Sequence, residues 1–145
     1  MEKKRYAIEI KADREKIWDV LWENESYRDW TSAFTEGSHM ITEGLVQDSK
    51  VQFLDPNGSG IYSVVEEHIP GRSLVLKHLG EIRNGEEQPA EKSDWSGALE
   101  IYTLSETDGS IRLDVDIDLS AEHAAMFDVT FPKALTRVKE LAEKN

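Results

Sequence analysis

The fold is decided by residues 45–119, which read LVQDSKVQFLDPNGSGIYSVVEEHIPGRSLVLKHLGEIRNGEEQPAEKSDWSGALEIYTLSETDGSIRLDVDIDL. Apolar and polar residues alternate here between turn sequences, a pattern typical of consecutive antiparallel strands. The turn sequences are DPNG at 55–58, PG at 70–71 and TDGS at 107–110. In these, proline presets φ, and glycine and asparagine tolerate a positive φ. The stretch therefore predicts four or five strands joined by short turns.

The individual strands can be placed from their alternation. We expect strands beginning at Val51 and over residues 61–69, 73–82, 95–104 and 111–119. The last is the clearest, because its odd-numbered residues are all apolar and its even-numbered ones are charged, as in a strand with one buried face. Residues 83–93 (RNGEEQPAEKS) are polar without periodicity and predict a loop.

The residues before this stretch predict one strand, two helices and a further strand. Tyr6, Ile8 and Ile10 alternate with polar neighbours, as in a half-buried strand. Asp13 is a suitable N-cap for a helix that ends near Asn24. A second short helix is expected where Ser26 and Asp29 resemble a capping box, and residues 34–41 suit a strand.

Residues 121–144 predict the longest helix, capped by Ser120. Its apolar residues recur at helical spacing: Ala124, Phe127, Phe131, Leu135, Val138 and Leu141. Pro132 interrupts the pattern, so the helix either kinks there or restarts. A sheet must cover one face, and this helix is the expected cover. The predicted fold class is α+β, a curved antiparallel sheet around a long C-terminal helix.

The amino-acid composition argues against several classes of function. The 145 residues predict a single domain, 1–145, and the net charge of −12 argues against binding nucleic acid or an anionic membrane. Without cysteine there is no thiolate chemistry. The four histidines do not pair at ligand spacing, so we expect no metal and no cofactor. The N-terminus lacks a signal-peptide pattern and no long apolar run occurs, which predicts a cytoplasmic protein.

Aromatic residues carry the candidate site. Five of them come from separate elements that can converge between sheet and helix, and we expect them to line an apolar hollow: Trp30, Phe53, Trp95, Phe127 and Phe131. Gly97 and Ala98 leave space beside Trp95. His78 and Tyr62 are candidates for orienting a ligand, and residues 83–93 for a lid. His78 is in phase with Leu74 and Leu76, so it is either a hydrogen-bonded core histidine or a general base.

Five segments together match a known family pattern. They are KADREKIWDVL (11–21), YRDWTSAF (27–34), GSGIYSVVEEHIPGRSLVLKH (58–78), DWSGALEIYTL (94–104) and FDVTFPKALTRVKELAEKN (127–145). In these segments and their order the chain resembles the START-like helix-grip superfamily, also called SRPBCC. Within it, the chain looks like the branch named after the C-terminal domain of the activator of heat-shock protein 90 ATPase. The resemblance implies the helix-grip fold. Members of the superfamily bind lipids, steroids, polyketides or other hydrophobic molecules, and some are cyclases.

Three functions follow from this reading. The leading hypothesis is the binding of a small hydrophobic molecule between the sheet and the C-terminal helix. The second is a co-chaperone-like interaction module whose partner is a chaperone. The third is an enzyme of the polyketide-cyclase kind, which needs an acid or base inside the cavity, with His78 as the first candidate. The superfamily's motifs are packing motifs, so the resemblance implies no catalytic residues.

Overall fold

The computed structural model describes residues 1–93 and 95–144, and the strands in those ranges form one eight-stranded antiparallel sheet. The elements are β1 (Glu2–Ile10), α1 (Arg14–Trp22), α2 (Asn24–Trp30), a 3-10 turn (Thr31–Ala33), β2 (His39–Ile41), β3 (Lys50–Leu54), β4 (Gly60–Ile69), β5 (Ser73–Arg83), β6 (Glu86–Glu87), a second 3-10 turn (Ala90–Lys92), β7 (Leu99–Thr107), β8 (Ser110–Leu119) and α3 (Ala121–Glu143). The sheet order is β1-β8-β7-β5-β4-β3-β2, and β6 pairs with β5. The predicted fold class is confirmed.

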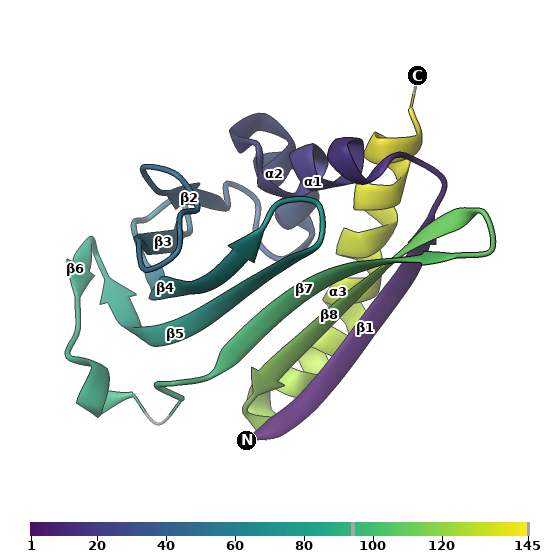
Figure 1. The fold of residues 1–145 in the computed structure, drawn as a ribbon. Helices are drawn as coiled ribbons and strands as arrows, with labels where there is room; N and C mark the ends of the chain where they lie inside the picture. Colours follow the sequence, from purple (N-terminus) through teal and green to yellow (C-terminus); the bar gives the residue numbers. More distant parts are fainter. Residues whose placement is uncertain (94, 145) are drawn as a thin grey trace.

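The sheet curves around α3, and α1 and α2 close one end (Figure 1). All three helices therefore lie on the same, concave face of the sheet. One apolar core fills the space between them. Its deeply buried members include Ile10, Ile17, Leu21, Leu74, Leu76, Leu113, Leu135 and Val138.

The strand β8 shows how the sequence pattern sets the register. Leu113, Val115 and Ile117 are buried on the concave face. Asp116 pairs with Arg5 of β1 at 2.7 Å on the opposite face. A shift by one residue would place the aspartates in the core, so the alternation specifies the pairing.

The helix α3 begins as predicted and continues through its proline. The Oγ of Ser120 accepts a hydrogen bond from the backbone N–H of His123 at 3.4 Å. Pro132 lies inside the helix on its exposed face, and the carbonyl of Pro132 accepts a hydrogen bond from Thr136 Oγ1 at 2.8 Å. Of the two predicted alternatives, the helix does not restart at Pro132.

Two strand predictions were too long. The segment predicted at 34–41 is a strand only over His39–Ile41, because the chain first makes a 3-10 turn and then bends at Gly37, whose φ is +89°. The segment predicted at 95–104 becomes a strand only at Leu99. Trp95 lies in a turn closed by a hydrogen bond from Ala98 N–H to the Trp95 carbonyl, and Gly97 there has a φ of +93°.

The predicted helix ends also differ. The first helix ends at Trp22, and the second already begins at Asn24. Ser26 is therefore inside the second helix, where its Oγ donates to the carbonyls of Asp19 and Glu23 and forms no capping box. Asp13 occupies the N-cap position of α1 but makes no capping hydrogen bond with its side chain.

The polar segment 83–93 is partly regular, contrary to the predicted loop. Residues 86–87 turn back and pair with β5. The carboxylate of Glu87 accepts hydrogen bonds from Lys50 at 2.8 Å and Gln52 at 2.9 Å, and these donors lower the pKa of Glu87. The segment is thereby fastened to β3 and β5.

Candidate functional site

Two adjoining hollows open between the concave face of the sheet and α3. The inner one has a volume of about 180 Å³ and the outer one about 400 Å³. They share four lining residues, which are Ile61, Glu100, Ile117 and Phe127. Because the walls are shared, we treat them as one site, called here the hollow, with an inner and an outer part.

The inner part is walled by aromatic rings. Those of Trp30, Phe34, Phe53, Tyr102, Phe127 and Phe131 contribute to it. Phe34 meets Phe127 and Phe131 edge to face, with centroids 5.6 and 4.9 Å apart. Trp30 Nε1 donates to the Leu21 carbonyl at 3.2 Å, whereas Trp22 Nε1 on the same wall is buried without a hydrogen-bond partner among the described residues. This part therefore offers mainly apolar surface.

The outer part adds polar groups to apolar walls. Trp95, Ala98 and Leu119 contribute apolar surface, and His78 and Glu100 face the same space. His123 borders it from the first turn of α3, where its Nδ1 lies 2.7 Å from Ser120 Oγ.

Three side chains form a continuous hydrogen-bonded row on the sheet. Ser63 Oγ lies 2.6 Å from His78 Nδ1, and His78 Nε2 lies 3.1 Å from Glu100 Oε1. Since a carboxylate only accepts, His78 donates its Nε2–H to Glu100, and in the neutral imidazole Nδ1 then accepts from the hydroxyl of Ser63. Ser63 is fully buried, so its hydroxyl orients the imidazole and is not available as a nucleophile in the hollow.

Tyr102 completes the row from the other side. Its hydroxyl donates to Glu100 Oε2 at 2.5 Å. Burial, followed by the negative charge of Glu100, raises the pKa of Tyr102 well above its usual range. Burial and the same carboxylate also raise the pKa of Tyr27. Both phenols therefore stay neutral, and Glu100 dominates the local field.

Six of the seven predicted site residues border the hollow. Trp30, Phe53 and Phe131 line the inner part, His78 and Trp95 the outer part, and Phe127 both. His78 is buried and hydrogen-bonded, as in the first of its two predicted roles.

Tyr62 lies elsewhere, and the predicted lid does not cover the hollow. The Tyr62 ring packs over Gly80, and its hydroxyl donates to the Gln88 carbonyl at 2.5 Å. Successive residues of a strand point to opposite faces, so Ser63 meets His78 while Tyr62 lies on the other face, beside β6. Among the described residues, neither Tyr62 nor any member of 83–93 lines the hollow.

Glu100 was missed by the sequence reasoning. It is paired across the sheet with Leu76 and Ile117, both buried. The signal is present in the chain, because Glu100 is in phase with Ala98, Tyr102 and Leu104, which are apolar or aromatic and buried. A carboxylate on the apolar face of a strand is unusual and marks a functional candidate.

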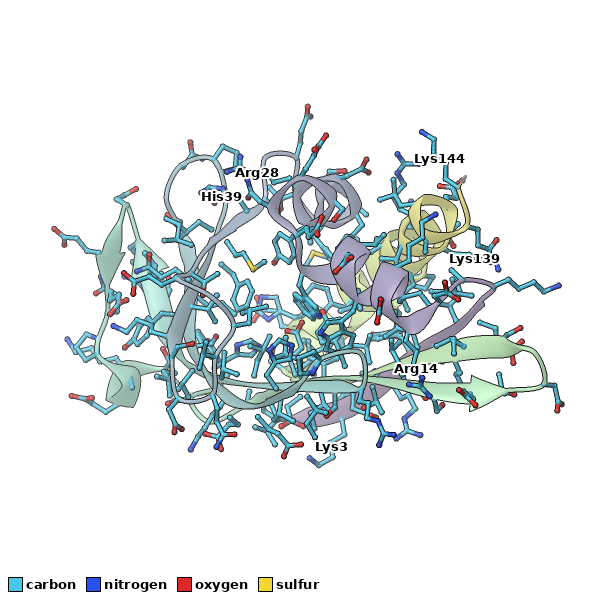
Figure 2. All side chains as sticks on the ribbon, turned by 45° about the horizontal axis from the view of Figure 1, so that its top comes forward. Lys3, Arg14, Arg28, His39, Lys139 and Lys144 are labelled. Carbon is cyan, nitrogen blue, oxygen red and sulfur yellow. The ribbon has the colours of Figure 1, made fainter. Side chains whose placement is uncertain are left out.

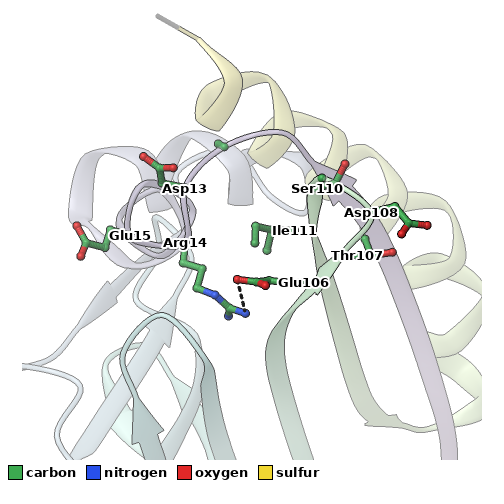
Figure 3. A pocket seen from close by; sticks show the side chains of 10 residues that line it. Asp13, Arg14, Glu15, Glu106, Thr107, Asp108, Ser110 and Ile111 are labelled. Atoms are coloured by element: carbon green, nitrogen blue, oxygen red, sulfur yellow. Dashed lines mark ion pairs between the residues drawn. The ribbon is translucent and has the colours of Figure 1, made fainter.

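A wider and more open cavity of about 820 Å³ lies between the start of α1 and the β7–β8 hairpin (Figure 3). Arg14 crosses it to Glu106 at 3.8 Å and donates to the carbonyls of Gly71 and Leu104. Its walls carry the exposed acidic side chains of Asp13, Glu15 and Asp108 (Figure 3). Arg14 has a structural role here, since it ties α1 to the β4–β5 turn and to strand β7, and the cavity has too little apolar wall to hold a hydrophobic molecule.

Two further observations concern metal ions and membranes. Within residues 1–93 and 95–144, no three histidine or acidic side chains are close enough together to hold a metal ion. In the same ranges no helix combines the length and apolarity needed to cross a bilayer.

Comparison with known proteins identifies solved structures that share this fold. No protein-family model and no curated protein sequence matches the chain. Among solved structures, the Aha1 dimer from Colwellia psychrerythraea superposes with a TM-score of 0.74 at 20% identity, over 99% of this chain and 97% of that one. The AHSA1-like protein from Aeromonas hydrophila gives a TM-score of 0.67 at 15% identity, over 98% and 92%.

A larger protein contains the same fold. DynU16, from the dynemicin biosynthetic locus, superposes with a TM-score of 0.71 at 12% identity over 99% of this chain and 48% of that one. At such identities the likeness establishes the fold and leaves the activity open. The chain therefore has the START-like helix-grip fold that its sequence predicts, in the form seen in Aha1-like proteins.

Proposed function

We propose that the protein binds a small hydrophobic molecule in the hollow. The observation that carries the proposal is the continuity of the inner and outer parts through shared walls, with aromatic rings contributed by α2, β3 and α3. Burial of apolar ligand surface supplies about 25 cal/mol per Å² before the entropy cost of association. The apolar part of a ligand gains this burial free energy when it inserts among the aromatic rings. Polar groups of the outer part then orient the ligand.

The test is the titration of an uncharged, environment-sensitive dye, N-phenylnaphthylamine. We expect stoichiometric binding, with enhanced dye emission and quenching of Trp30 and Trp95, which border the hollow. Native mass spectrometry of freshly purified protein provides an independent measurement, because a tightly held natural ligand is then seen as added mass.

A filling substitution locates the dye. Ala98 is buried and lines the outer part, so Ala98→Leu is expected to occupy the hollow and weaken dye binding by about tenfold or more. Ala125 is exposed on α3, so Ala125→Leu makes the same chemical change away from the hollow and should leave binding unchanged. Equal binding by both variants, or no dye binding by the parent protein, would contradict the proposal.

The co-chaperone-like role is the second candidate, and it has one observation in its favour. Met126 and Val129 are exposed on α3, at 50% and 57%, and form an apolar strip on the outer side of the helix. The structural likeness to Aha1-like proteins supports the same reading. Met126→Lys should abolish chaperone binding in a pull-down with purified heat-shock protein 90 if this role holds, without altering dye binding.

A further inference from the structure

Glu100 differs from the other carboxylates that border the hollow. Glu81 pairs with Arg83 at 2.8 Å, and Asp118 pairs with Lys3 at 3.1 Å. Glu100 is instead hydrogen-bonded to His78 and Tyr102, and the described residues provide no lysine or arginine partner for it. Among the described carboxylates that border the hollow, Glu100 is thus the one whose negative charge is not paired with a lysine or an arginine.

The hollow as a whole favours positive charge. None of its described lining residues is a lysine or an arginine. Lys3 and Lys144 lie at the edge of the molecule (Figure 2), and Arg14 is engaged outside the hollow by Glu106 and two backbone carbonyls. An anionic head group would meet Glu100 across a wall of low dielectric, where like charges repel strongly. A fatty acid is therefore a poor candidate for the ligand.

Glu100 also retains capacity to accept hydrogen bonds. A carboxylate accepts about four, and His78 and Tyr102 use one site on each oxygen. The Glu100 side chain is 18% exposed, whereas that of His78 is 7% exposed. It borders both parts of the hollow, so a ligand body can lie among the aromatic rings with its head group at this carboxylate.

We propose that the ligand is an amphipathic amine whose ammonium group binds Glu100 while its apolar body fills the aromatic part of the hollow. This inference rests on the function proposed above and names the class of ligand. An ammonium group donates up to three hydrogen bonds. Charge-assisted bonds of this kind are about twice as strong as neutral ones. His78 and Tyr102 act as positioning residues, since they hold the carboxylate toward the hollow.

The experiment is a head-group series on one apolar body. Naphthylmethylamine, naphthylmethanol and naphthoate are titrated by calorimetry against the full chain at neutral pH and an ionic strength of about 0.15 M, where long-range attraction by the net charge is largely screened. We expect the amine to bind about tenfold more tightly than the alcohol, and the carboxylate to bind most weakly. Equal affinities, or a preference for naphthoate, would overturn the inference.

Two variants assign the preference to Glu100. Glu100→Gln is expected to lower the affinity for the amine about tenfold and to leave that for the alcohol unchanged. Glu81→Gln removes another carboxylate from the same wall, one already paired with Arg83, and should retain the preference for the amine. Should Glu100→Gln retain it too, Glu100 is not the anchor.

The outcomes separate this inference from the function on which it rests. If all three naphthyl probes bind without discrimination, the hollow binds hydrophobic molecules and only the amine specificity fails. If none binds, the proposed function fails with it. Thermal melts of each variant report folding, and the series on the parent protein decides the head-group preference even if Glu100→Gln does not fold.

Discussion

At the scale of single residues, Phe131 joins the core to the hollow. It is 2% exposed, and its ring stacks on Tyr6 with centroids 4.8 Å apart and an interplanar angle of 9°. It also borders the inner part of the hollow. The same side chain therefore stabilises the fold and shapes the site.

Phe131→Ala should destabilise the protein by about 3 kcal/mol, at the low end of the usual range for a buried phenylalanine, because one side of the ring already borders a cavity. Urea unfolding gives the free energy. Val129→Ala, on the exposed side of the same helix, should change it by less than about 0.5 kcal/mol. A loss of about 1 kcal/mol or less for Phe131→Ala would show that the ring is not packed as described.

The residues of the site were predictable to different degrees. His78 follows from its phase with Leu74 and Leu76, since period-two alternation fixes which face a side chain takes. The same alternation places Tyr62 away from the hollow, because Tyr62 is out of phase with Ile61 and Ser63, which lie on the side of the hollow. Glu100 was not among the predicted site residues, although its phase with Tyr102 and Leu104 places it on the buried face of its strand.

At the scale of elements, α2 and α3 are joined by an ion pair. Two side-chain nitrogens of Arg137 reach the carboxylate of Asp29, Nε at 2.7 Å and Nη2 at 3.0 Å. Hydrogen bonding by Arg137 lowers the pKa of Asp29. Since α2 supplies Tyr27 and Trp30 to the hollow, this pair holds part of its wall.

The pair should make stability depend on pH. A lowered folded-state pKa means that the stabilisation is fully present above the ordinary aspartate value, near 4, and is lost as pH falls through the lower folded value. Both side chains are more than a third exposed, so we expect less than about 1 kcal/mol. Asp29→Asn should remove that amount at neutral pH in urea unfolding and nothing at a pH of about 2. An equal effect at both pH values would mean that packing, and not charge, links the helices.

Element boundaries were harder to predict than element types. The β8 alternation and the α3 spacing are long enough to outweigh local exceptions, so even Pro132 on the exposed face does not end the helix. The late starts of the strands predicted at 34–41 and 95–104 depend on positive φ at Gly37 and Gly97. Glycine permits such a conformation without requiring it, so the chain alone does not locate the bend.

At the scale of the whole molecule, the net charge of −12 affects stability and binding together. The exposed ion pairs each contribute little, and salt weakens them. The excess of acidic residues repels itself in the compact state, and salt relieves that repulsion. With 29 acidic and 17 basic residues, repulsion is the larger effect.

Raising the ionic strength from about 0.01 M to about 0.15 M, over which the Debye length shortens from about 30 to 8 Å, should therefore raise the melting temperature. An uncharged solute at equal osmolality is the control, and a fall in melting temperature with salt would show that the ion pairs dominate.

The same increase in ionic strength separates two sources of amine binding. Attraction by the distant surface charges is screened, whereas direct pairing with Glu100 inside the hollow is screened much less, so a preference for the amine that survives the added salt belongs to that carboxylate.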